Sequence, residues 1–282
     1  MTGCRRRPGR SAALLSLPAV LGLLALAACT TTTQVVRPGG DPAPAPVEER
    51  RNTQDPAEIE RRAKLRLELA ALYFSRNQAS TALDELKLAL NAKPDMPEAH
   101  SLRGLILASQ NDFRGADESF QRALQLDPRN ADTMHNYGWV LCQQRRYDEA
   151  EAQFRNAMAL PQYGEQMRTL LAQGVCQARA GRWAEAEKTL SRSYELDPAN
   201  PVTAYNLSEV LMRRGELERA RFYIRRVNQV NELTTAQSLW LAARIERRLG
   251  NTQQLTEIGR QLRDRFPQSP EALQFERGRF DD

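Results

Sequence analysis

Alanine recurs at a nearly constant interval through most of this 282-residue chain. The interval is 34, 34, 36 and 34 residues, and the alanines are Ala82, Ala116, Ala150, Ala186 and Ala220. A fixed period of this length is the signature of a repeat protein, in which each unit stacks on its neighbours. Because one unit cannot bury its apolar face alone, the chain is constrained to a linear stack of similar units.

Other residue types repeat in register with the alanine. Each unit has a small residue in its first half, a large residue four places after the alanine, and in most units a proline near its end. The small residues are Ala70, Gly104, Gly138, Gly174 and Ser208, the large ones Leu86, Phe120, Phe154, Leu190 and Ile224, and the prolines Pro94, Pro128, Pro161 and Pro198. This pattern resembles the tetratricopeptide repeat, a helix-turn-helix unit. It predicts an all-α superhelical solenoid of about six repeats.

The small residues let the two helices of a unit approach closely, and the proline ends the second helix. We place the repeats at 63–96, 97–130, 131–164, 167–200, 201–234 and 236–269. In the sixth, Leu255 replaces the small residue and Gly259 the large one, so its packing is left open. Asn130 and Asn200 are expected as N-caps. Gly181, Gly215 and Gly250 are expected in turns.

Pro270–Asp282 is expected to cap the end of the solenoid, in part as a helix. Pro270 and Glu271 suit a helix start, while Leu273 and Phe275 offer apolar cover. The solenoid with this cap is predicted to cover residues 58–282, with the first helix beginning near Pro56.

Residues 1–28 are interpreted as an export signal. Arginines open it, and the apolar run from Leu14 to Leu26 is too short to span a bilayer. The segment Leu26-Ala27-Ala28-Cys29 resembles a bacterial lipobox, which implies cleavage before Cys29 and lipidation of that residue. Thr30, rather than Asp, follows the cysteine, so the expected location is the periplasmic face of the outer membrane. The alternative is an ordinary soluble signal peptide.

Residues 29–57 are rich in Thr and Pro and are expected to form a flexible tether. Removing the signal leaves 36 basic and 35 acidic residues, which gives no indication of nucleic-acid binding. Basic pairs cluster late in the chain, at Arg213-Arg214, Arg225-Arg226 and Arg247-Arg248. They form either a solvated helix face or a patch that faces a partner.

Besides the expected lipid site Cys29, the mature chain contains two cysteines, Cys142 and Cys176, which are 34 residues apart. Both lie near the ends of first helices in adjacent repeats, so a disulfide is geometrically open, and an oxidising periplasm favours one. Two separate buried thiols are the alternative. Without nearby histidines, the pair does not complete a metal site.

The sequence carries no motif for catalysis, a cofactor, a metal or a small-molecule substrate. His100 and His135 occupy comparable places in neighbouring repeats and are expected to be ordinary repeat positions. An enzyme whose site the repeats conceal would need a deep pocket with convergent carboxylates or a bound metal.

The first helices of such repeats line a concave groove that suits an extended peptide. The residues expected there are Asn136, Trp139, Gln143, Arg179, Tyr205, Asn206, Glu209, Arg213, Trp240 and Arg244. Trp139 and Tyr205 either present their rings to a partner or pack between repeats. The lysines of the carboxylate clamp found in chaperone-binding repeats are absent here.

Three segments, together with the lipobox, tether and repeats, resemble the PilF/PilW family of type IV pilus biogenesis and stability lipoproteins, also called pilotins. They are Leu67–Phe74, Asn136–Gln144 and Gly174–Gly181, and the last two contain the cysteine pair. The resemblance implies an outer-membrane lipoprotein that binds the secretin of the type IV pilus and helps it to assemble. A different lipoprotein adaptor, for peptidoglycan enzymes or outer-membrane assembly, is the alternative.

Overall fold

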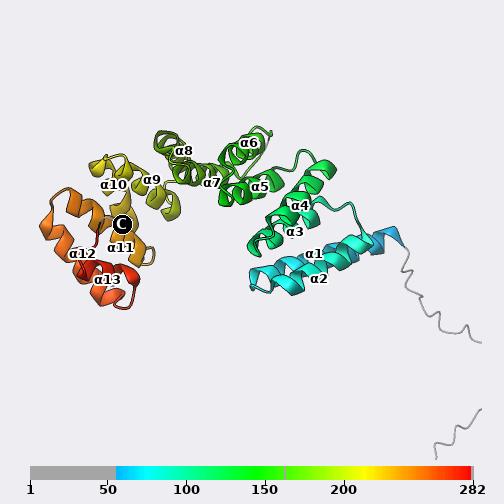
Figure 1. Cartoon of the computed structure of the whole chain (residues 1–282), viewed down its shortest axis with the longest axis horizontal. Helices are drawn as coiled ribbons and strands as arrows, with labels where there is room; N and C mark the ends of the chain where they lie inside the picture. The colour runs from blue at the N-terminus through cyan, green and yellow to red at the C-terminus, as the bar shows by residue number, and fades with distance from the viewer. Residues whose placement is uncertain (1–54, 162, 281–282) are drawn as a thin grey trace, which may run out of the picture. The chain divides into compact units, whose positions relative to one another are not determined.

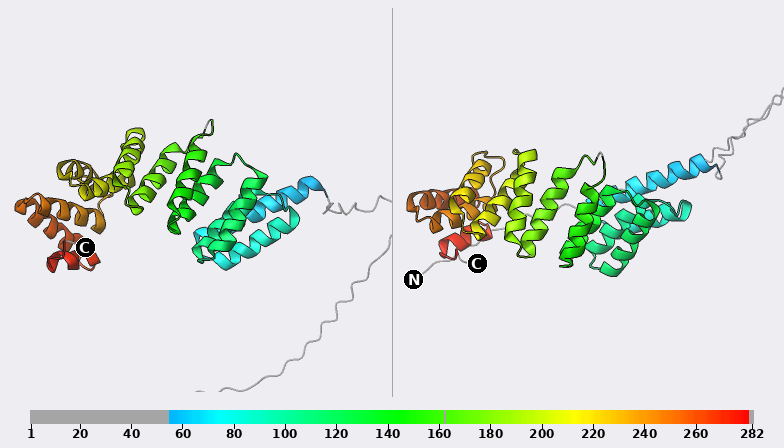
Figure 2. Two further views of the ribbon diagram at one scale, coloured as in Figure 1. Left: turned by 45° about the horizontal axis from the view of Figure 1, so that its top comes forward. Right: turned by 90° about the horizontal axis from the view of Figure 1, so that it is seen from above.

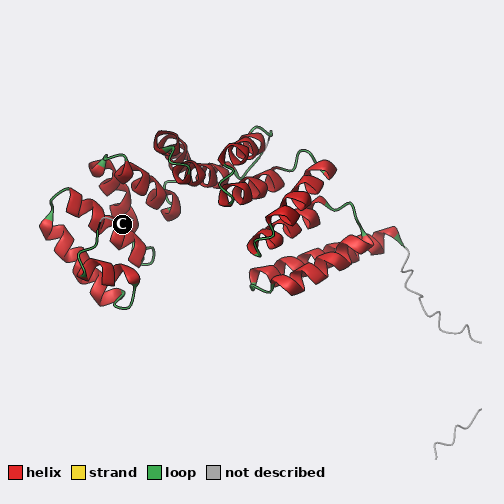
Figure 3. Ribbon diagram, in the orientation of Figure 1, coloured by secondary structure: helices red, strands yellow, loops and turns green. Residues whose placement is uncertain are grey.

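A computed structural model describes residues 55–161 and 163–280. The signal at 1–28, the lipid site Cys29 and the tether up to residue 54 lie outside the described residues. In the described part there are thirteen α-helices and no strand (Figure 3). The predicted all-α fold is therefore confirmed.

The helices form six antiparallel pairs and a short last helix (Figure 1). They are α1 Pro56–Ser75, α2 Ala79–Ala92, α3 Pro97–Ser109, α4 Phe113–Leu126, α5 Ala131–Gln143, α6 Tyr147–Met158, α7 Gln166–Arg179, α8 Trp183–Leu196, α9 Pro201–Arg213, α10 Leu217–Asn228, α11 Ala236–Arg248, α12 Thr252–Arg265 and α13 Pro270–Glu276. Each pair coincides with one predicted repeat, although α1 starts upstream of residue 63. Asp55 caps α1, so the helix begins two residues before the expected boundary at 58. No helix in the described ranges combines the length and apolar character needed to cross a bilayer.

The two helices of a pair play different parts in the stack. The backbone of each first helix lies close to the first helix of the next unit, whereas the backbone of each second helix lies close to its own partner and to the next first helix. Neighbouring second helices meet through side chains, as where Tyr194 of α8 contacts Tyr223 of α10. The first helices therefore form one row, the inner row, and Figure 1 shows the second helices α6, α8, α10 and α12 on its outer side, in what is called the outer row. Figure 2 shows the pairs stacked in chain order. This is the arrangement expected of a helical solenoid.

Small residues set the spacing within the pairs, as the sequence predicts. A Cβ atom on Gly138 would lie 2.9 Å from Phe154, and one on Gly174 would lie 2.6 Å from Leu190. In the fifth unit, the Ser208 hydroxyl donates to the Ala220 carbonyl across the crossing, at 2.8 Å. The missing or small side chain on the first helix makes room for the large residue of the second helix, so the two helices can approach closely.

Helix ends follow local sequence in most units. Asn130 accepts from the backbone N–H of Thr133, and Asn200 accepts from two backbone N–H groups of α9. The turns of the last three pairs have positive φ at Gly181, Gly215 and Gly250, as expected. In the first three pairs, the same turn position is taken by residues that are not glycine, namely Asn77, Asn111 and Arg145.

The sixth unit closes on the C-terminal segment. A Cβ atom on Gly259 would lie 2.3 Å from Phe275, so the missing side chain on α12 makes the space that Phe275 of α13 fills. Pro270 occupies the first turn of α13, as the sequence predicts, and Ser269 caps the helix. The expected cover by Leu273 is wrong, because Leu273 points outward and is 45% exposed.

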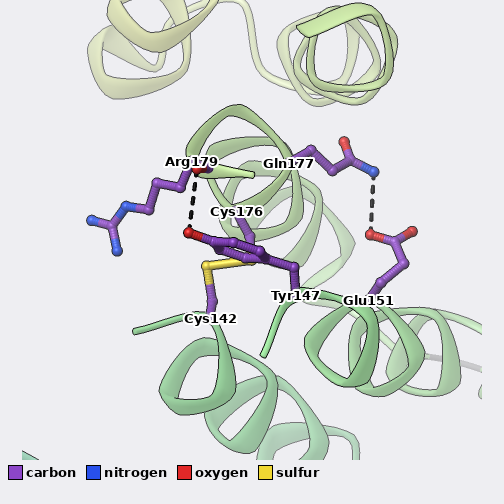
Figure 4. Close-up of a disulfide and its surroundings, with 6 residues drawn as sticks. All are labelled: Cys142, Tyr147, Glu151, Cys176, Gln177 and Arg179. Carbon is purple, nitrogen blue, oxygen red and sulfur yellow. Dashed lines mark hydrogen bonds between the residues drawn. A yellow bond between two sulfur atoms is a disulfide. The ribbon is translucent and has the colours of Figure 1, made fainter. Parts of the chain in front are cut away.

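A disulfide joins Cys142 of α5 to Cys176 of α7, with Cα atoms 5.8 Å apart (Figure 4). Tyr147 packs against the buried apolar residues around the disulfide, and its hydroxyl donates to the carbonyl of Arg179 at 3.2 Å. Nearby, the Gln177 amide donates to Glu151 at 3.2 Å. The third and fourth units are thus joined by a covalent bond and by polar contacts on either side of it.

Candidate functional site

Two groups of side chains on the first helices make up the candidate groove. The first group lies where α5 meets α7. The guanidinium of Arg179 lies 4.9 Å from the ring centre of Trp139. Asn136 lies one turn before Trp139 on α5, and its side-chain oxygen accepts from Arg168 of α7 at 3.4 Å. The structure therefore pairs Trp139 with Arg179, and it pairs Asn136 with Arg168, which the sequence did not predict.

The second group lies where α9 meets α11. Burial raises the pKa of the Tyr205 hydroxyl, Glu209 raises it further, and Arg244 acts in the opposite direction. Burial also lowers the pKa of Arg244, as do the nearby cations Arg213 and Arg248. These mutual effects show that the two helices direct tyrosine, carboxylate and guanidinium groups toward a common region.

An apolar hollow adjoins the second group. It has a volume of about 280 Å³, and Tyr205 forms one of its walls. Its other lining residues are Pro201, Val202, Val227, Leu233, Thr235, Gln237 and Ser238. Val202 and Leu233 are exposed at this hollow, so an apolar side chain of a bound segment would bury surface there.

Two predicted groove residues take no part in these groups. The amide of Asn206 donates to the Val202 carbonyl of its own helix at 2.8 Å, and Gln143 is exposed at the end of α5. Trp139 and Tyr205 are half-buried, each packed against the core on one side. Each ring therefore packs partly between repeats and leaves its other side exposed.

The late basic pairs divide into two kinds. Arg214 pairs with Glu187 and Glu216, and Arg225 pairs with Glu246. By contrast, within the described part of the chain no carboxylate lies within 4.0 Å of Arg213, Arg244, Arg247 or Arg248. These four arginines, hereafter the arginine cluster, lie on the last turn of α9 and on α11.

The C-terminal segment covers part of the predicted groove. The ring of Phe280 stacks on Trp240 with centroids 5.0 Å apart, and the Phe280 carbonyl accepts from Nε of Arg244 at 3.2 Å. Arg244 is only 8% exposed as a result. The expectation that Trp240 and Arg244 face an open groove is therefore wrong for this structure. Phe280 occupies no repeat position, so the periodicity carried no signal for it.

No group of three or more His, Cys, Asp or Glu side chains among the described residues is placed to hold a metal ion. A hollow of about 780 Å³ is lined by residues of the single helix α1 alone, namely Ala57, Glu58, Glu60, Arg61, Arg62, Lys64, Leu65 and Glu68. It is therefore a stretch of open helix surface and not a site where several elements converge.

Comparison with known proteins places these features in a family. The tetratricopeptide repeat matches residues 97–130, 130–199 and 177–239. The type IV pilus assembly protein PilF of Pseudomonas aeruginosa is 27% identical over 210 residues, covering 74% of this chain and 83% of that protein. The crystal structure of PilW, a widely conserved type IV pilus biogenesis factor, superposes with a TM-score of 0.70 at 31% identity. That match covers 75% of this chain and 96% of PilW. A structure of P. aeruginosa PilF gives a TM-score of 0.66 at 25% identity, covering 78% and 99%.

Proposed function

Since this chain belongs to the PilF/PilW family of tetratricopeptide-repeat proteins of type IV pilus biogenesis, we propose that it binds segments of secretin subunits in its groove. Binding would promote localisation and multimerisation of the secretin in the outer membrane. The observation that carries the proposal is the pairing of polar and aromatic side chains along the inner row of helices. Trp139 with Arg179, and Tyr205 with its apolar hollow, lie on successive first helices.

Such a row suits an extended segment of a protein partner. Half-buried aromatic rings lose little conformational entropy on binding and provide most of the contact area, while amide and guanidinium groups bind main-chain carbonyls. We place the activity of this protein in binding rather than in a reaction of its own, which accords with a family of repeat scaffolds.

The membrane anchor is the second part of the proposal. Lipids on Cys29 would hold the protein at the outer membrane, because each buried CH2 group contributes roughly 0.8 kcal/mol and two or more chains make release slow. The stretch between Cys29 and α1 would leave the groove free to reach secretin subunits on the periplasmic side.

The groove is tested with Trp139→Ala and Tyr205→Ala, each expressed from the chromosome. We expect each variant to reduce the heat-resistant secretin multimers and the secretin captured with the protein from detergent-solubilised membranes. Phe222→Ala is the matched control, because Phe222 is an exposed aromatic residue on α10 in the outer row. Normal multimers in both groove variants, or capture of murein hydrolases in place of secretin, would overturn the proposal.

The anchor is tested with Cys29→Ala. We expect that protein to lose its lipid, to leave the membrane fraction and to lower the amount of secretin in the outer membrane. Mass spectrometry that finds an unmodified Cys29 in the exported wild-type protein would contradict this part alone and leave the groove proposal standing.

A further inference from the structure

The C-terminal segment occupies the inner face of the last repeat in the manner of a bound peptide. We propose that the surface of Trp240, Arg244 and Arg247, hereafter the Phe280 cradle, is a second binding site. It would take an aromatic residue followed by acidic residues in an extended segment of a partner protein. In the free protein Phe280 fills this site, and the partner segment displaces it.

The contacts of Phe280 are those of ligand recognition. Its ring is 5% exposed, stacks on Trp240, and lies 4.5 Å from the guanidinium carbon of Arg247. Arg244 binds its main-chain carbonyl. The three cradle residues share one face of α11, since they are spaced by four and three positions. The cradle thus binds an aromatic side chain and the main-chain carbonyl of the same residue, as in the recognition of extended peptides.

The charges around the cradle indicate what should follow the aromatic residue. Arg244 and Arg247 contact Phe280, and the charges of Arg213 and Arg248 act on Arg244, as does the opposite charge of Glu209 on α9. No carboxylate of the described residues lies at ion-pair distance from the arginine cluster, so positive charge prevails at this site. The residues next to Phe280 in the sequence are Asp281 and Asp282. A segment with an aromatic residue followed by acids therefore complements the site in charge as well as in shape.

The chain is built so that Phe280 can leave without loss of the fold. The helix α13 is fixed by Phe275, which fills the space at Gly259. Beyond it, Gly278 turns the chain with φ 64°, and only the last described residues return to α11. Displacement would therefore require a change of backbone at one glycine, the loss of one hydrogen bond, and the loss of the contacts that the Phe280 ring makes with Trp240, Arg247 and Phe275.

The test uses the full chain carrying Phe280→Ala, which leaves the cradle open. The probe is a synthetic peptide with the sequence of residues 277–282. We expect this variant to bind the peptide at least tenfold more tightly than the wild-type chain, in which Phe280 competes at high effective concentration. Replacing the phenylalanine of the peptide by alanine, or both of its aspartates by asparagine, should weaken binding at least tenfold.

Two further variants separate the cradle from nonspecific attraction. Arg244→Gln in the Phe280→Ala chain should weaken binding at least tenfold. Phe222→Ala, which removes a Phe–Arg contact on α10, should leave the wild-type behaviour unchanged. These measurements use a peptide, so they succeed or fail independently of the proposed binding of a secretin.

Several results would overturn the proposal. One is a Phe280→Ala chain that binds no better than wild type. Another is faster hydrogen exchange throughout α11 and α12 in that variant, since the segment would then be a fixed part of the core. A wild-type chain that dimerises, with the dimer lost in Phe280→Ala, would assign the cradle to self-association instead.

Discussion

In the turn between α5 and α6, Arg145 has φ 61°, a conformation that costs an L-residue roughly 1–2 kcal/mol. The same turn position is glycine in the last three units, and Arg145 itself is exposed. We predict that Arg145→Gly raises the free energy of unfolding by about 1 kcal/mol, measured by urea denaturation. The reverse change, Gly215→Arg, should lower it by a similar amount. An unchanged or lower midpoint for Arg145→Gly would show that the turn is not strained.

His135 is a residue with a pH-dependent effect on folding. It is buried on α5, with Nδ1 2.9 Å from the Thr169 hydroxyl, which also meets the Tyr163 hydroxyl. Burial, and secondarily Arg168, lowers the pKa of His135 from 6.5 to about 4. The folded state therefore disfavours the protonated ring. Between pH 6.5 and 4 the unfolded chain binds more protons, so this contribution to stability is present above pH 6.5 and is lost as the pH falls.

The expected slope from His135 is at most roughly 1.4 kcal/mol per pH unit in that window. We predict that His135→Gln makes unfolding less dependent on pH between 6.5 and 4, measured by urea denaturation at several pH values. Carboxylates contribute to both proteins, so the difference between the two curves isolates the imidazole. Parallel curves would assign the pH dependence to other groups.

Among the helices, the α5–α7 contact is held by the disulfide of Cys142 and Cys176. The chain-entropy estimate for a loop of 34 residues is roughly 4 kcal/mol. We predict that a reductant lowers the stability of the wild-type protein by up to about this amount, seen as a lower urea midpoint. The double variant Cys142→Ala, Cys176→Ala should have the lower midpoint already and should not respond to reductant. If reductant leaves the urea midpoint of the wild-type protein unchanged, Cys142 and Cys176 are not bonded in solution.

The elements differ in how far the sequence predicts them. Helix pairs, N-caps and close crossings follow from local residue types, so Asn130 and Gly138 could be assigned from the sequence. The left-handed turn at Arg145 could not, because the residue type opposes it and the packing of α5 on α6 imposes it. Phe275 and Leu273 on α13 show the same limit. Only the gap at Gly259 on another helix decides which of them is buried.

In the candidate site too, the sequence predicts some features and leaves others to contacts between distant segments. Positions on the first helices were predictable because the repeat fixes which face lines the groove, and Trp139, Arg179 and Tyr205 do meet neighbours there. What lies over those positions depends on contacts between segments distant along the chain. The carbonyl of Phe280 reaches Arg244 from 36 residues away, which no periodic pattern encodes.

For the described chain as a whole, contacts run only between neighbouring units, and α13 contacts only the last pair. Stability in such a stack is approximately a sum of unit terms and nearest-neighbour terms. A change at one end should therefore weaken the units near it and leave distant units unchanged. The C-terminal end allows a direct test, because α13 covers the space at Gly259 and ends the row of first helices.

We predict that a chain truncated after Gln268 exchanges its amide hydrogens at least tenfold faster in α11 and α12, because their apolar faces lose the cover of α13, above all of Phe275 at Gly259. Exchange in α3 to α8 should stay within error of the full chain, measured by mass spectrometry of proteolytic fragments. Leu273→Ala is the matched control, since it changes an exposed residue of α13 and should leave both regions protected. Faster exchange throughout all six pairs would mean that the solenoid unfolds as one cooperative unit. Unchanged exchange in α11 and α12 would mean that the last pair needs no cap.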